Sequence, residues 1–364
     1  MEPKYLIIDP RPLECFKEKT FSEFKKRDVF SELMKSIEKG KIENTCFWIT
    51  ECITSGYTID LFEKLIIFSC KIIHINNPRL PAFLWNKYSS FYNSISHINN
   101  NNKQKKDLIH LRNTQSIRNG LIDVGVTLAL SSKDKRFDKY PKLKEDEDFS
   151  FSTIKNKLNA TMQILPSHII RFTDPEELRV IMNEFFFNLK NKLGGYEKCV
   201  YWILWLVQWE KINKKKKIAF EIEERPIQGL KPKLCKDLIW LVWSVIFEEA
   251  NIRGNEIKEQ IQYLFLLFKT NFSSGKRNQR LPLVYLAVGY LTLPIKFNTP
   301  IRKSNDIFIK TQSNVNKLFA DKKKFEKKEY IEPPKKVKVI ASNEKEISQA
   351  QMNRIKEIDE IFFQ

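Results

Sequence analysis

Glycine is scarce in this chain: only 10 of its 364 residues are glycine, well below the usual share of about 7%. Tight hairpins and phosphate-binding loops depend on glycine, because it adopts backbone conformations that other residues avoid. The scarcity therefore favours helices over sheets. Aromatic residues are plentiful, with 27 Phe and 7 Trp, so a chain of this length can bury a sizeable core as one large domain or two ordinary ones.

Apolar residues recur at helical spacing through the first 131 residues. Helices are expected over residues 21–38, 42–54, 58–75, 80–98 and 106–131. Gly40 follows the first of them where a C-cap is expected, and Ser55-Gly56 separates the second from the third. Residues 1–131 are therefore predicted to form an N-terminal helical subdomain.

A charged stretch divides the chain after this point. Residues 132–150 mix acidic and basic side chains, contain Pro141 and have few aliphatic residues, which predicts a linker. Residues 151–295 are expected to form a C-terminal helical subdomain. In it, Thr173-Asp174-Pro175 has the capping residue and early proline of a helix start, and that helix is predicted to run to about residue 192.

Two tryptophan-rich segments of this second subdomain resemble each other. Trp202, Trp205 and Trp209 are matched by Trp240, Trp243 and Phe247, each displaced by 38 residues. HEAT-like helix pairs repeat at about 40–47 residues, but stable arrays need about three repeats. The predicted fold is therefore all-α, either an irregular helical bundle or a short HEAT-like helical array with a disordered basic C-terminal tail.

Residues 296–364 form the predicted tail, which is rich in lysine and contains Pro333-Pro334. Its last residues follow a different pattern. Four apolar residues fall on one helical face, and they are Ile355, Ile358, Ile361 and Phe362. A short amphipathic helix is marginal alone, so this face is predicted to dock on this protein or on a partner.

The sequence contains no recognisable catalytic or metal-binding motif. The histidines His74, His97, His110 and His168 lack the spacing of zinc ligands. The Ser-Ser-Gly-Lys-Arg segment at 273–277 lacks the first glycine and the hydroxyl residue of a phosphate-binding loop. We therefore expect no catalytic residue, no metal and no cofactor, although acids that interrupt apolar helices are open to a catalytic or a structural interpretation.

Cysteine usage and hydropathy restrict the setting of the chain. None of the six cysteines forms a CxxC pair, which fits a reducing compartment. No apolar run reaches the roughly 18 residues of a membrane-spanning helix. No membrane partner is expected.

Positive charge is the strongest functional signal, because Lys and Arg number 63 against 44 Asp and Glu, a formal charge of +19. Such a charge attracts polyanions. The predicted nucleic-acid-binding residues come from two clusters: Lys211, Lys214, Lys215, Lys216, Lys217, Lys276, Arg277 and Arg280. The first cluster is also what a solvated helix C-terminus favours, and the overall charge is also what the codon bias of an AT-rich genome produces.

Three blocks of the sequence resemble a known family. Residues 47–91, 199–217 and 236–251 look like uncharacterised proteins encoded by nucleocytoplasmic large DNA viruses, the giant viruses. The resemblance implies a setting rather than an activity: the host cytoplasm, in the viral factory, or the virion. The resulting expectation is a non-enzymatic helical accessory protein that binds nucleic acid or the viral nucleic-acid machinery. The resemblance also makes viral proteins the expected partners of the C-terminal helix. An internal virion or factory scaffold without nucleic-acid binding is the alternative.

Overall fold

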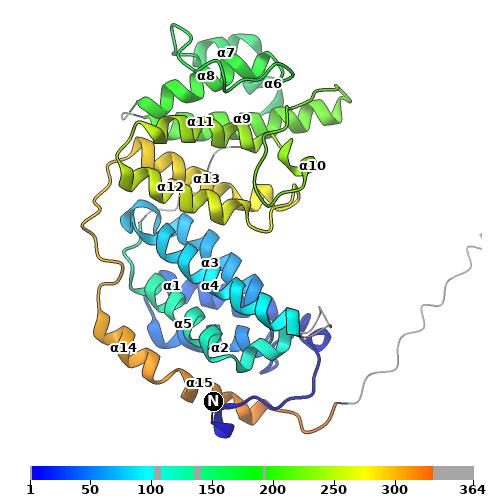
Figure 1. Ribbon diagram of the computed structural model, residues 1–364, viewed down its shortest axis with the longest axis vertical. Helices are drawn as coiled ribbons and strands as arrows, with labels where there is room; N and C mark the ends of the chain where they lie inside the picture. Colours follow the sequence, from blue (N-terminus) through cyan, green and yellow to red (C-terminus); the bar gives the residue numbers. More distant parts are fainter. Residues whose placement is uncertain (1, 102–107, 135–139, 141, 192–193, 331–364) are drawn as a thin grey trace, which may run out of the picture. The chain divides into compact units, whose positions relative to one another are not determined.

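A computed structural model describes residues 2–101, 108–134, 140, 142–191 and 194–330 (Figure 1). Every regular element in these ranges is a helix, and one isolated β-bridge joins Lys19 to Lys25. The predicted all-α fold is confirmed. Among the described helices, none combines the length and the apolar character needed to cross a membrane.

The chain divides into two compact units. Of the described residues, the larger unit comprises those from 2 to 8 and from 12 to 326, and the smaller comprises 9–11 and 327–330. In the smaller unit, Asp9 forms an ion pair with Arg11 and accepts a hydrogen bond from the backbone N–H of Lys327. All helices named below belong to the larger unit.

The first half of the larger unit is a group of packed α-helices accompanied by short 3-10 segments. Its elements are η1 (Pro3–Tyr5), η2 (Leu13–Phe16), α1 (Lys26–Glu38), α2 (Ile42–Thr54), α3 (Thr58–Ile72), η3 (His74–Asn76), α4 (Leu80–Asn101), η4 (Leu108–Asn113) and α5 (Gln115–Leu130). α2 packs against α1 and α5, and α4 packs against α5. Gly40 has a φ of +66°, as expected for the residue that ends α1.

The second half contributes a further set of helices. They are α6 (Glu145–Asp148), α7 (Phe151–Lys157), α8 (Glu177–Lys190), α9 (Gly195–Lys215), α10 (Pro232–Cys235), α11 (Ile239–Asn251), α12 (Asn255–Lys269) and α13 (Arg277–Thr292). α8 packs against α9 and α11, and α12 packs against α11 and α13. α9 and α11 bury Trp202, Trp205, Trp240 and Trp243. Between them lies only the four-residue α10 instead of the second long helix of a HEAT-like pair, so the 38-residue displacement of the tryptophans does not mark a HEAT-like repeat.

One core spans both predicted subdomains. α13 packs against α3, and α12 packs against α4. Tyr140, within the predicted linker 132–150, places its ring 5.2 Å from that of Tyr285 on α13. The residues on either side of 132–150 therefore share one continuous apolar cluster, and this stretch does not separate two cores.

The described part of the predicted tail is also folded onto this core. Residues 296–330 contain α14 (Asn305–Ser313), α15 (Val315–Lys322) and η5 (Lys323–Phe325). α14 packs against α5, and α15 packs against α2 (Figure 1). Phe319 is completely buried, so the expectation of a tail from residue 296 onward is wrong for these helices. The predicted docking residues Ile355, Ile358, Ile361 and Phe362 lie outside the described residues.

A buried ion pair fixes α15 to α2. The ammonium of Lys322 contacts the carboxylate of Glu51, and both side chains are almost fully buried. Glu51 also accepts hydrogen bonds from the backbone N–H of Ser22 at 2.8 Å and from its hydroxyl at 2.7 Å. Burial alone would raise the pKa of Glu51, but the charge and hydrogen bond of Lys322 outweigh it, and the pKa lies below its ordinary value.

Loss of this ion pair should destabilise the fold. We predict that Lys322→Ala lowers the free energy of unfolding by about 3–5 kcal/mol, because it leaves the Glu51 carboxylate buried without its cation. Lys317→Ala, on an exposed position of the same helix, should change it by less than about 0.5 kcal/mol. Urea unfolding of the two variants measures both values, and equal small losses would show that α15 does not depend on the pair.

Stability should also fall in acid. The lowered pKa means that, below the ordinary value of 4.5, unfolded Glu51 binds a proton that folded Glu51 does not. The contribution is therefore fully present above that pH and is lost as pH falls through the lower folded value. We predict a steeper loss of unfolding free energy for the wild type than for Glu51→Gln/Lys322→Met, measured by urea unfolding from neutral pH down to about pH 3. Parallel curves would contradict this assignment.

Candidate functional site

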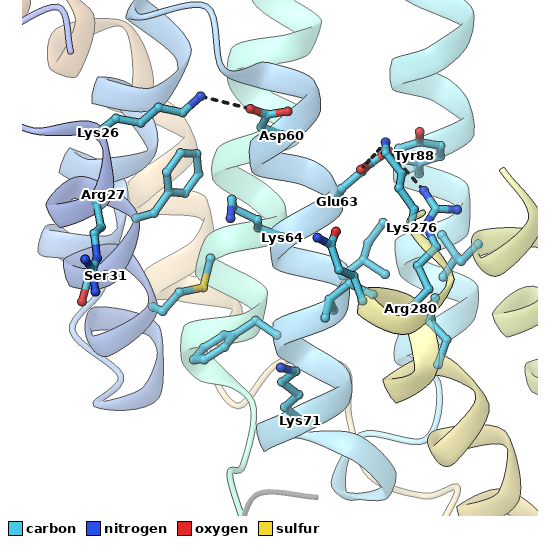
Figure 2. A pocket seen from close by; sticks show the side chains of 18 of the residues that line it. Lys26, Arg27, Ser31, Asp60, Glu63, Lys64, Lys71, Tyr88, Lys276 and Arg280 are labelled. Carbon is cyan, nitrogen blue, oxygen red and sulfur yellow. Dashed lines mark hydrogen bonds and ion pairs between the residues drawn. The ribbon is translucent and has the colours of Figure 1, made fainter. Parts of the chain in front are cut away.

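An open groove of about 1230 Å³ lies between α1, α3 and the N-terminal part of α13 (Figure 2). The segment before α1 contributes residues 17–19, α4 contributes Tyr88, and the end of α12 contributes Leu267. Pockets for small molecules usually enclose about 300–1,000 Å³. The groove is therefore large enough for a segment of a polymer.

Basic side chains dominate the polar part of the groove. Nine cations line it, and they are Lys17, Lys19, Lys25, Lys26, Arg27, Lys64, Lys71, Lys276 and Arg280. Only three acids, Glu18, Asp60 and Glu63, accompany them. Since the cations come from four separate parts of the chain, the fold itself concentrates positive charge here.

Apolar side chains form the floor between these cations. The floor residues are Phe30, Met34, Ile66, Ile67, Phe68, Leu267 and Leu283. Phe30 and Met34 are four residues apart on α1, and this spacing places both on one face of the helix. The groove therefore combines a cationic rim with an apolar floor.

Some rim cations are already neutralised inside the protein. Lys26 pairs with Asp60 at 3.2 Å, and Lys276 pairs with Glu63 at 3.0 Å. Arg280 also contacts Glu63, at 3.2 Å, and donates hydrogen bonds to the carbonyl oxygens of Phe268 and Thr270. Figure 2 shows Glu63 between the two cations that it holds.

Four other rim cations have no such partner. Within the part of the chain that the structure describes, no acidic side chain lies within ion-pair distance of Lys17, Lys25, Arg27 or Lys64. All four are exposed. The ammonium of Lys64 lies 5.0 Å from the ring centroid of Phe30, directly beside the apolar floor. These four cations are available to an anionic ligand.

The structure separates the three residues predicted at 276–280. Lys276 and Arg280 line the groove. Arg277 is instead absent from the groove lining, and its guanidinium pairs with Asp237 at 2.9 Å and with Glu210. Burial alone would lower the pKa of Arg277, but the two carboxylates raise it above its ordinary value. The charge of Arg277 is therefore neutralised by carboxylates of the protein itself.

The cluster at 211–217 lies at the exposed end of α9, outside the groove lining. Lys214 pairs with Glu210 at 2.8 Å, so Glu210 contacts both this cluster and Arg277. The remaining predicted lysines, Lys211, Lys215, Lys216 and Lys217, are exposed. Their contact with nucleic acid stays a prediction.

The sequence prediction missed the four available cations of the groove. A signal for some of them is present, because Lys25-Lys26-Arg27 is a short basic run at the start of α1. Lys64 and Lys71 are seven residues apart, two turns of α3, and therefore share a face. Neither pattern indicates that α1 and α3 form the walls of one groove.

The described lining of the groove contains no histidine and no cysteine. Elsewhere, burial raises the pKa of the Cys46 and Cys70 thiols to about 12, which keeps them protonated and unreactive at neutral pH. Among the described residues, no group of three or more His, Cys, Asp or Glu side chains could hold a metal ion.

Comparison with known proteins adds no assignment: no family model, no curated protein and no solved structure matches this chain.

Proposed function

We propose that this protein is a non-enzymatic helical accessory protein that binds nucleic acid, and that the groove between α1, α3 and α13 is the binding site. The observation that carries the proposal is the charge of the groove lining, with nine cations against three acids. Among the described residues, four of those cations have no acidic partner, so a ligand that brings negative charge would neutralise them.

The phosphate backbone of a nucleic acid supplies such charge at regular intervals. Lysine and arginine side chains that neutralise phosphates release condensed counterions, and this release drives binding without reading the base sequence. The formal charge of +19 on the chain supports the same class of partner. Binding through the groove should therefore be strongly salt-dependent and tolerant of sequence.

The proposed setting is the viral factory in the host cytoplasm or the virion of a giant virus. It rests on the sequence resemblance of residues 47–91, 199–217 and 236–251. In that setting the protein would accompany viral nucleic acid or the proteins that process it.

Neutralising the available cations should weaken binding. We predict that Lys25→Gln/Arg27→Gln/Lys64→Gln reduces the affinity for a labelled oligonucleotide and lowers the slope of log affinity against log salt by about 2–3, since each lost phosphate contact removes about 0.7–0.9. Fluorescence anisotropy at several salt concentrations measures both quantities.

The matched control for this variant lies outside the groove. Lys215→Gln/Lys216→Gln/Lys217→Gln removes the same charge from the end of α9 and should have a much smaller effect. The opposite result, full loss in the α9 variant and none in the groove variant, would move the site to residues 211–217 and refute the groove.

Removing an acid from the groove should have the opposite effect. We predict that Asp60→Asn tightens binding several-fold, because it frees the ammonium of Lys26 for a phosphate. The Lys26–Asp60 pair is substantially exposed, and exposed pairs contribute only about 0–1 kcal/mol to stability, so the fold should persist. Asp28→Asn makes the same charge change on α1 outside the groove lining. An equal gain in affinity in both variants would show that the gain comes from net charge and not from the release of Lys26.

A further inference from the structure

The floor of the groove raises a question that charge alone does not answer. Contact with phosphates requires only the cationic rim, yet the space between the cations is lined by Met34, Ile67 and the other apolar residues named above. We infer that the groove binds single-stranded nucleic acid, with its sugars and unpaired bases against the apolar floor. This inference rests on the proposed function and specifies its ligand.

The order of side chains along α3 supports the binding of a single strand. Lys64, Ile67 and Lys71 follow one another at intervals of three and four residues, so they lie on one face of the helix. All three line the groove, and Ile67 is only partly buried. An apolar contact therefore lies one turn from a cation on either side.

The facing wall repeats the pattern on α1. Arg27, Phe30 and Met34 are also spaced by three and four residues, and all three line the groove. Met34 is only partly buried, whereas Phe30 retains 8% of its surface. Figure 2 shows Arg27 on this wall and Lys64 on the opposite one. A single strand of nucleic acid between α1 and α3 would meet cations on both sides and the apolar floor below.

A duplex cannot use this floor in the same way. Its bases are stacked inside, and the charged backbones face outward, so it presents phosphate and sugar to the protein surface. Phosphate held against an apolar floor would lose water without gaining a hydrogen bond. A single strand exposes base faces and sugars together with its phosphates, and single-strand sites combine a basic groove with aromatic side chains on which bases stack. In this groove the partly buried Met34 and Ile67 would provide the contact surface in place of exposed aromatic rings.

An acidic amphipathic helix from another protein is the other macromolecule that such a groove could hold. The charge distribution favours the nucleic acid. The groove lining carries nine cations against three acids, and the chain carries +19 overall. A nucleic acid brings a phosphate with every nucleotide and can neutralise several of these cations, whereas a short acidic helix brings only a few carboxylates.

The experiment compares how the full 364-residue chain binds single-stranded and duplex DNA. Fluorescence anisotropy is measured with a labelled oligothymidylate of about 20 nucleotides, long enough for a single-strand site, and with a duplex of the same length at the same salt concentrations. We expect the single strand to bind at least about tenfold more tightly, since only the single strand can place bases on the floor.

Floor variants test the contact directly. Met34→Gln/Ile67→Gln should weaken single-strand binding about three- to tenfold by removing apolar contacts with bases, while the salt slope and duplex binding stay unchanged. Ile252→Gln, at an exposed position at the end of α11, is the control and should have no effect. If the double variant fails to fold, Met34→Gln alone serves, because glutamine closely matches methionine in length.

Each alternative result has a separate meaning. Equal affinity for duplex and single strand, or floor variants that bind like the wild type, would overturn the single-strand inference and leave the proposed function intact. Failure to bind either oligonucleotide at low salt would refute the proposed function itself. Under that result, binding of a labelled acidic amphipathic peptide that Met34→Gln weakens would assign the groove to a protein partner and overturn the inference as well.

Discussion

The structure depends on the burial of α13 on all sides. Residues 281–292 of this helix are all buried, and a helix that is apolar all round must be covered all round. α3 covers it from the first half of the chain, and α8, α9, α11 and α12 cover it from the second. This requirement joins the two halves in one core. It also places the polar first turn of α13 at the edge of that core, where Lys276 and Arg280 meet Glu63 of α3.

Several charges inside the core form ion pairs, and this pairing distinguishes them from the exposed cations Lys17, Lys25, Arg27 and Lys64 of the groove. Lys322 contacts Glu51, Arg225 contacts Asp174, and Arg277 contacts Glu210. A buried charge without a partner costs several kcal/mol, so such pairs are required for the fold. The exposed cations of the groove carry no such requirement, because water solvates them. Structural pairing therefore accounts for Arg277 but not for the concentration of Lys25, Arg27 and Lys64 around one floor.

The sequence predicted correctly those helices that carry a strong apolar stripe and end at a clear turn signal. The bounds of α2 match the expected 42–54, because the apolar stripe is strong and Ser55-Gly56 follows it. α14 and α15 were missed, because short segments with few apolar residues become helical only through packing against α5 and α2. The groove was missed for a related reason. Its cations belong to separate segments, and only the tertiary fold brings α1, α3 and α13 together.

The same limit explains why Arg277 looked like a ligand-binding residue. It stands in the sequence between two residues of the groove lining, Lys276 and Arg280, but an interval of one residue turns a helical side chain by about 100°. Arg277 therefore faces Glu210 and Asp237, whereas its neighbours face Glu63. A basic cluster on a helix thus divides between two environments. Helical geometry indicates that such a division occurs, and only the packing of α9 against α13 decides which arginine pairs with Glu210.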